Sequence, residues 1–264
     1  MFGMNGSVKF RIRMFVIMVL TMITFCYAIS LGNAASVMIS PISLNIGSEK
    51  PATLLTLNNL GDSDIAIQVR IKRWVSGGFQ DTLVDQSEII ASPPYVVIPA
   101  GGRQIVRLVD TNRGQSSDGE MPYRVLVDEI PRSGVGEGSA GNVSFQMRYS
   151  VPLFVGGPEL NAADPEQRQV LANDLSRNLK TTVVTSSDGQ PALKVFNGGS
   201  YHARITKLRV RGVDGRAVPV AEGLLGYVLA GEEVQFPMPS AISALRPGAS
   251  LVAEVNSVEL LLIN

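Results

Sequence analysis

Residues 65–72 alternate between strongly apolar side chains and small or polar ones. The apolar members are Ile65, Ile67, Val69 and Ile71, and between them lie Ala66, Gln68, Arg70 and Lys72. A hydrophobic repeat of two residues is typical of a β-strand that has one buried face and one solvent-exposed face. This segment therefore restricts the chain to folds in which a sheet buries one of its sides.

Short apolar runs of the same kind recur between clusters of turn residues. In the first half they cover residues 37–46, 53–58, 65–74, 104–109, 123–130 and 143–155. Turn-rich stretches at 60–63, 76–78, 99–102 and 113–120 separate them. Several short strands with regular turns over ~100 residues predict an immunoglobulin-like β-sandwich.

The second half shows the same pattern after an interruption. A Gly-Gly-Pro break at 156–158 precedes a polar segment, 161–180, in which one short helix is expected. Strand-like runs then resume at 181–185, 192–196, 205–210, 217–220, 224–229, 234–236 and 251–262. We expect one domain over residues 35–157, a hinge or linker over 158–180 and a second β-sandwich over 181–264.

The two halves also contain a weak internal repeat. Asn59 precedes a glycine turn and a strand that ends at 71, and Asn197 precedes a glycine turn and a strand that ends at 210. Two copies of a similar sandwich would explain the match. Chance is the alternative, because such turns recur in any β protein.

The first 34 residues have the order of a secretory signal peptide. Lys9, Arg11 and Arg13 precede an apolar run over 14–31, and small residues at 32–34 offer a cleavage site before Ala35. The alternative is a retained membrane anchor, because the run is close to the length that spans a bilayer. Cleavage would remove Cys26 and leave a chain without disulfides.

Composition disfavours nucleic-acid binding, metal sites and catalysis. The chain has 23 basic and 23 acidic residues, one Cys and one His. A neutral chain lacks the basic excess of nucleic-acid binders, and a single His with a single Cys cannot supply a zinc site. His202 is interpreted as a solvated turn residue, and the Gly-rich stretch 136–141 as a hairpin loop. We expect no enzyme activity and no cofactor.

The segment 143–154 reads VSFQMRYSVPLF. One face would carry Val143, Phe145, Met147, Tyr149 and Val151. An ordinary core strand explains this pattern equally well. However, the strand is long and follows a Gly-rich loop, and an exposed apolar edge strand is an aggregation hazard unless it pairs with a partner.

Several motifs resemble the periplasmic chaperones of chaperone–usher pili, the PapD-like family. They are Gly47-Ser48-Glu49-Lys50, Ala91-Ser92-Pro93-Pro94, Ile98-Pro99-Ala100-Gly101, Asp128-Glu129-Ile130-Pro131 and Pro152-Leu153-Phe154. The stretch 148–152, together with a Trp that ends the third strand, is similar to the archaic branch of that family.

The resemblance implies an all-β protein with two immunoglobulin-like domains arranged at an angle. It implies a chaperone in the periplasm that lends its long seventh strand to a pilus or fimbrial subunit and delivers the subunit to an outer-membrane usher. The lent residues would come from the apolar face of 143–151. No cofactor, nucleic acid or membrane is implied after signal cleavage. The alternative is an exported adhesin or carbohydrate-binding module, which the single Trp makes weak.

One departure from the family concerns the cations that clamp the subunit's terminal carboxylate. The two corresponding positions fall at Ile42 and Pro152, which carry no charge. A buried carboxylate needs charged donors. Arg107 and Arg148 are the candidates, since each is a cation in an apolar strand. An alternative for Arg107 is a pair with Glu129 that links the two domains. Arg70, Lys72 and Arg73 are further candidates.

Overall fold

The structure is a computed structural model. It describes residues 37–47, 50–77, 80–112, 119–130, 146–157, 165–186, 189–238 and 248–263, and five single residues at 10, 14, 15, 17 and 18. The predicted cleavage site, the Gly-rich loop, Val143 and Phe145 lie outside the described residues. Within the described residues, no helix combines the length and hydrophobicity needed to cross a membrane.

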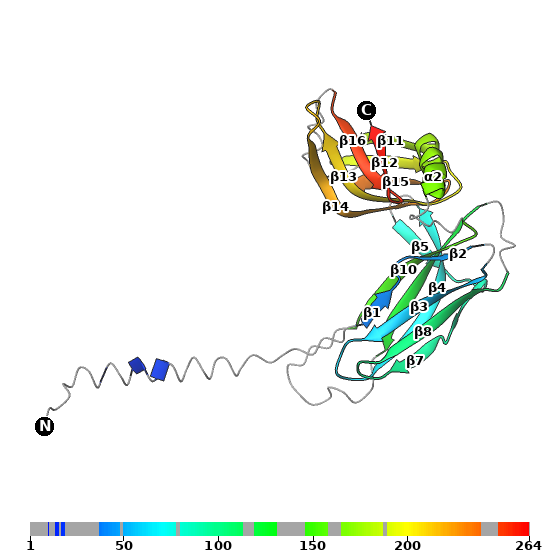
Figure 1. The fold of residues 1–264 in the computed structure, drawn as a ribbon, viewed down its shortest axis with the longest axis vertical. Coiled ribbons are helices and arrows are strands. Elements are labelled where there is room, and N and C mark those ends of the chain that lie inside the picture. The colour runs from blue at the N-terminus through cyan, green and yellow to red at the C-terminus, as the bar shows by residue number, and fades with distance from the viewer. Residues whose placement is uncertain are drawn as a thin grey trace.

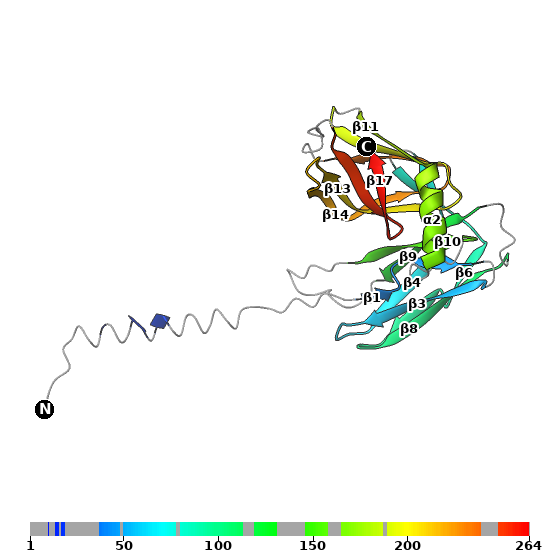
Figure 2. The ribbon, with the colours of Figure 1, turned by 45° about the horizontal axis from the view of Figure 1, so that its top comes forward.

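The first domain is a sandwich of two sheets (Figures 1 and 2). One sheet has the order β1 (Val37–Ser40), β3 (Ala52–Asn59), β8 (Arg103–Asp110) and β6 (Ile89–Ser92). The other has the order β2 (Leu44–Ile46), β10 (Arg148–Val155), β9 (Met121–Ile130), β4 (Ile65–Gly77) and β5 (Gln80–Val84), with β7 (Tyr95–Ile98) also pairing with β4.

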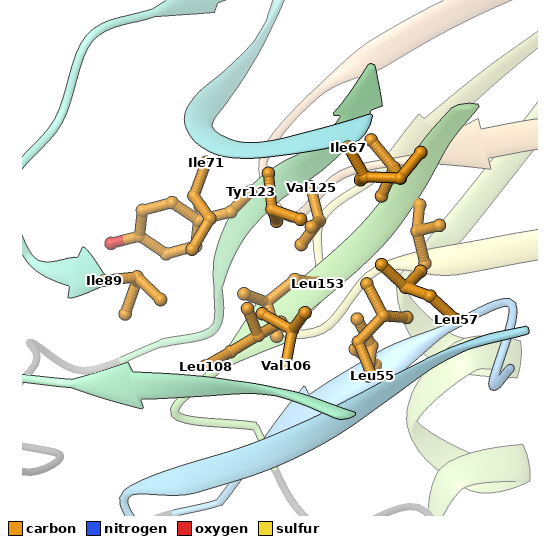
Figure 3. Packing of buried hydrophobic residues seen from close by; sticks show 14 of the residues in the cluster. Leu55, Leu57, Ile67, Ile71, Ile89, Val106, Leu108, Tyr123, Val125 and Leu153 are labelled. Carbon is orange, nitrogen blue, oxygen red and sulfur yellow. The ribbon is translucent and has the colours of Figure 1, made fainter. Parts of the chain in front are cut away.

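The core between these sheets follows from the alternation of their strands. Ile67 and Ile71 of β4 face inward, as the two-residue repeat predicts, and pack in the same cluster as Leu55, Leu108 and Leu153 (Figure 3). All of them are buried. Removing this much apolar surface from water is the main stabilising contribution to the domain, which no disulfide assists among the described residues.

The second domain has its own two sheets and its own core. One sheet consists of β11 (Leu179–Thr185), β12 (Pro191–Asn197) and β15 (Glu233–Pro237). The other has the order β14 (Ala217–Val228), β13 (Ala203–Arg211), β16 (Ser250–Val255) and β17 (Val258–Ile263). The two domains lie at an angle (Figure 1), and the predicted all-β, two-domain fold is confirmed.

The helix α2 (Pro165–Asn178) belongs to this second domain. Its Leu171 and Leu175 are buried in the second core. The expected linker over 158–180 is therefore too long, because an apolar stripe on the helix ties residues 165–178 to the β-sheets.

The internal repeat corresponds to the same buried corner in both domains. Asn59 Oδ1 accepts a hydrogen bond from Gly61 N–H at 3.0 Å, and Asn197 Oδ1 accepts one from Gly199 N–H at 3.0 Å. Each amide nitrogen donates to a carbonyl four residues ahead and to a carbonyl at the end of a distant strand. Both asparagines are fully buried. The repeated geometry favours two copies of one sandwich over chance.

Candidate functional site

β10 is a strand of the first domain with a partly open edge. On one side it pairs antiparallel with β9 along its whole length. On the other side, parallel β2 covers only Leu153 to Val155. Among the described strands, none pairs with that side of residues 148–152. Such an edge offers backbone hydrogen-bonding groups to an added strand.

The inward face of β10 continues from the buried core to an exposed rim. Val151 is only 6% exposed and belongs to the domain's own core, and Tyr149 packs against that core. Two residues earlier, Met147 is 43% exposed. Its carbonyl accepts a hydrogen bond from Glu129 N–H at 3.1 Å, which keeps it in register with β9.

These positions separate the five residues predicted to bind a partner. The prediction that Val151 binds a partner is corrected, because its side chain is buried in the core of the first domain. Tyr149 is at the border, and Met147 is exposed beyond it. Val143 and Phe145 precede Met147 by even spacings and stay predictions, because they lie outside the described residues.

The outward face of the same sheet carries a charged cluster around Asp128. Arg70 donates to Asp128 Oδ2, with Nη2 at 2.6 Å and Nε at 3.0 Å, and Arg148 pairs with Oδ1. Burial of the carboxyl raises its pKa, but the hydrogen bonds and charges of the two arginines outweigh this and hold the pKa of Asp128 below its usual value. Arg148 is still 64% exposed, beside the open edge.

We expect the substitution Asp128→Asn to lower the free energy of unfolding at pH 7 by about 1–2 kcal/mol. The pKa of Asp128 is depressed in the folded state, so its stabilisation is present above the ordinary carboxyl value of 3.8. It is lost as the pH falls through the folded value. Urea unfolding at pH 7 and pH 3 should show the two proteins converging in acid.

Asp85→Asn is the matched control, because Asp85 also pairs with a cation, Lys72, but the side chain of Asp85 is exposed. Its effect should be much smaller. Parallel pH profiles for the wild type and Asp128→Asn would contradict the role assigned to Asp128.

The two arginines predicted to clamp a carboxylate have different surroundings. Arg107 is exposed on β8, in the sheet that does not contain β10. Glu129 lies on β9 opposite Ile67, on the inward face of the other sheet. The two side chains form no ion pair in the described structure, and both belong to the first domain. The predicted interdomain pair of Arg107 with Glu129 is therefore wrong.

The joint between the domains is instead an aromatic cluster at the end of β10. Trp74 and Phe154 of the first domain pack with Leu229 and Tyr227 of the second. Trp74 meets Tyr227 edge to face with ring centroids 5.6 Å apart. The guanidinium of Arg124 lies 3.7 Å from the Trp74 ring centroid. Burial lowers the pKa of Arg124, with Asp81 opposing this, and an arginine stays charged in proteins.

His202 closes this joint. Its ring stacks on Phe154 with centroids 3.5 Å apart, and its Nδ1 lies 2.7 Å from Glu120 Oε2. Its backbone N–H also donates to that oxygen at 2.8 Å. The interpretation of His202 as a solvated turn residue is wrong, because it is only 8% exposed. Sequence reasoning missed Arg124 as well, although it is a cation in an apolar run like Arg107 and Arg148.

We expect His202→Ala to loosen the joint, because it removes the stack on Phe154 and leaves the Glu120 carboxylate with fewer donors. Trp74 is the only tryptophan of the chain and reports on the joint directly. Its fluorescence should shift to longer wavelength, and small-angle scattering should give a larger radius of gyration. Tyr95→Ala removes an exposed ring from β7 and should change neither measurement. An unaltered Trp74 spectrum in His202→Ala would refute this account.

Comparison with known proteins identifies the first domain. Residues 36–160 match the model of the pili and flagellar-assembly chaperones, PapD N-terminal domain. The first domain belongs to the PapD family of pilus-assembly chaperones. Comparison of the sequence with curated proteins finds no match.

Solved structures extend the similarity over both domains. CsuC, from a complex with the tip adhesion subunit CsuE of the archaic Csu pili of Acinetobacter baumannii, is 29% identical with a TM-score of 0.63. The alignment covers 86% of this chain and 97% of that one. This agrees with the predicted resemblance to the archaic branch. The family is a class of chaperones rather than enzymes.

Two further structures are similar in fold alone. The CupB2 chaperone of Pseudomonas aeruginosa is 15% identical with a TM-score of 0.53, over 85% of this chain and 97% of that one. The complex of the SafA pilin with the SafB chaperone of Salmonella enterica matches at 16% identity and a TM-score of 0.55, over 88% and 97% of the two chains.

Proposed function

We propose that the mature protein is a periplasmic chaperone that holds a pilus subunit on the open edge of β10 and delivers it to an outer-membrane usher. The observation that carries the proposal is this edge, where β2 covers β10 only from Leu153 onward and the inward apolar face extends to an exposed Met147. Strand addition gives affinity through backbone hydrogen bonds and selectivity through alternate side chains.

The side chains that enter the subunit are Val143, Phe145 and Met147, with Tyr149 at the border. Val151 takes no part, because it remains in the chaperone's own core. Each large apolar side chain that becomes buried contributes about 1.5–3 kcal/mol. Such a gain holds the subunit without ATP until a neighbouring subunit replaces the lent strand at the usher.

The cation that receives the subunit's terminal carboxylate is Arg124, assisted by Arg148. β2 occupies the edge of β10 from Leu153 onward, so an added strand must end near Pro152. The neighbour of Pro152 across the sheet is Arg124. Arg148 remains an exposed cation beside the same edge. Arg107 lies in the other sheet and is not suited to this role.

A subunit with two glycines added to its C-terminus should bind the wild-type protein about tenfold more weakly, because its carboxylate no longer reaches the guanidinium. Arg124→Gln should bind the native and the extended subunit alike. Competition between the two subunits in pulldown measures the ratio. A wild-type protein that does not discriminate between them would argue against Arg124 as the anchor.

The function itself is tested by co-expression with the pilus subunit. The subunit should accumulate in the periplasm only in the presence of this protein, copurify with it, and pass into fibres when the usher is added. Equal accumulation without the protein would contradict the proposal. Binding of a glycan array without any effect on the subunit would favour the alternative of an exported carbohydrate-binding module.

A further inference from the structure

Met147 places a thioether on the exposed rim of β10. Its backbone is fixed by the hydrogen bond from Glu129, while its side chain is 43% exposed. A methionine sulfur that solvent reaches is open to two-electron oxidants such as peroxides. The position is also the first described residue of the apolar face on the open edge.

The other methionines that follow residue 36 have different surroundings. Met238 is buried in the second core. Met121 is partly buried, and its sulfur accepts a hydrogen bond from Arg73 Nη2 at 3.4 Å. Met38 is 49% exposed, but it lies on β1 in the sheet that does not contain β10. Oxidant therefore reaches Met38 and Met147 first, and of these two only Met147 is on the binding edge.

We propose that Met147 is an oxidation site, and that its oxidation prevents the edge of β10 from binding a pilus subunit. The sulfur attacks one oxygen of hydrogen peroxide, an S–O bond forms and the O–O bond breaks. The departing hydroxide takes up the remaining proton and leaves as water. The sulfur loses two electrons to give the sulfoxide, and the peroxide is reduced.

The consequence rests on the proposed function. A thioether can be buried in the core of a subunit, whereas a sulfoxide carries a strongly polar S–O group into a site that offers it no donor. Burial of an unpaired polar group opposes capture. The lesion is reversible, because methionine sulfoxide reductases return the thioether.

The test uses the mature full-length protein, treated with hydrogen peroxide and mapped by peptide mass spectrometry. Met38 and Met147 should oxidise well before Met121 and Met238. Capture of the subunit by the oxidised wild type should fall about tenfold relative to the untreated protein. Treatment with methionine sulfoxide reductase should restore it.

Two variants locate the effect. Met38→Leu should capture the subunit like the wild type and lose capture on oxidation to the same extent. Met147→Leu is compared only with its own untreated sample, and its capture should be insensitive to peroxide. Equal losses in Met147→Leu and the wild type, or a Met147 that stays reduced while Met121 oxidises, would overturn the proposal. If the untreated wild type does not capture the subunit, it is the proposed function that fails.

Discussion

Met147→Asp combined with Phe145→Asp should abolish capture of the pilus subunit while the protein stays folded. Two carboxylates on this face would have to enter an apolar groove, and an unpaired buried charge costs far more than the few kcal/mol that the lost side chains contributed. Met147 is already exposed in the free protein, so the change at that position removes no core packing. Pulldown of the co-expressed subunit should fall below detection.

Met38→Asp is the control, since it places the same charge on a similarly exposed methionine of the other sheet. It should leave the pulldown unchanged. Circular dichroism and urea unfolding should be the same in all the variants. If the double variant still holds the subunit, the edge of β10 is not the binding strand, whatever the family of the domain.

The fold could be predicted because the alternation of side chains that indicates a strand lies within a few consecutive residues. The alternation of Ile65 to Ile71 appears in the structure as β4, with these side chains in the core. The even spacing of Tyr149 and Met147 likewise fixes which side of β10 they share. Tertiary packing determines where along the strand the buried core ends. For this reason Val151 was predicted as a binding residue although it is buried.

The joint was beyond prediction because it depends on contacts between residues far apart in the chain. His202 and Glu120 are separated by 82 residues, and nothing in either neighbourhood indicates the other. Arg107 and Arg148 look equivalent in sequence, since each is one cation in an apolar strand. The structure separates them because β8 and β10 belong to different sheets. Pairing of sheets is a property of the whole domain that the strand pattern does not contain.

Asn59→Ala should lower the free energy of unfolding of the first domain by about 2–4 kcal/mol. Its amide nitrogen donates to the carbonyls of Ser63 at 2.7 Å, Pro99 at 3.0 Å and Ile98 at 3.2 Å. Alanine removes a donor from each of these carbonyls and the acceptor of the Gly61 N–H, at a position where the asparagine side chain is fully buried. Urea unfolding followed by circular dichroism measures the loss.

The internal repeat makes this prediction sharper, because Asn197 occupies the equivalent corner of the second domain. Asn197→Ala removes donors from the carbonyls of Tyr201 at 2.7 Å and Val228 at 3.0 Å, and should destabilise that domain by a similar amount. Asn58→Ala, one residue away on the opposite face of β3, should have little effect. A loss at Asn58 as large as that at Asn59 would mean that the strand tolerates no change there. Matched losses at Asn59 and Asn197 alone would mean that a pair of buried amides closes the same corner in both sandwiches.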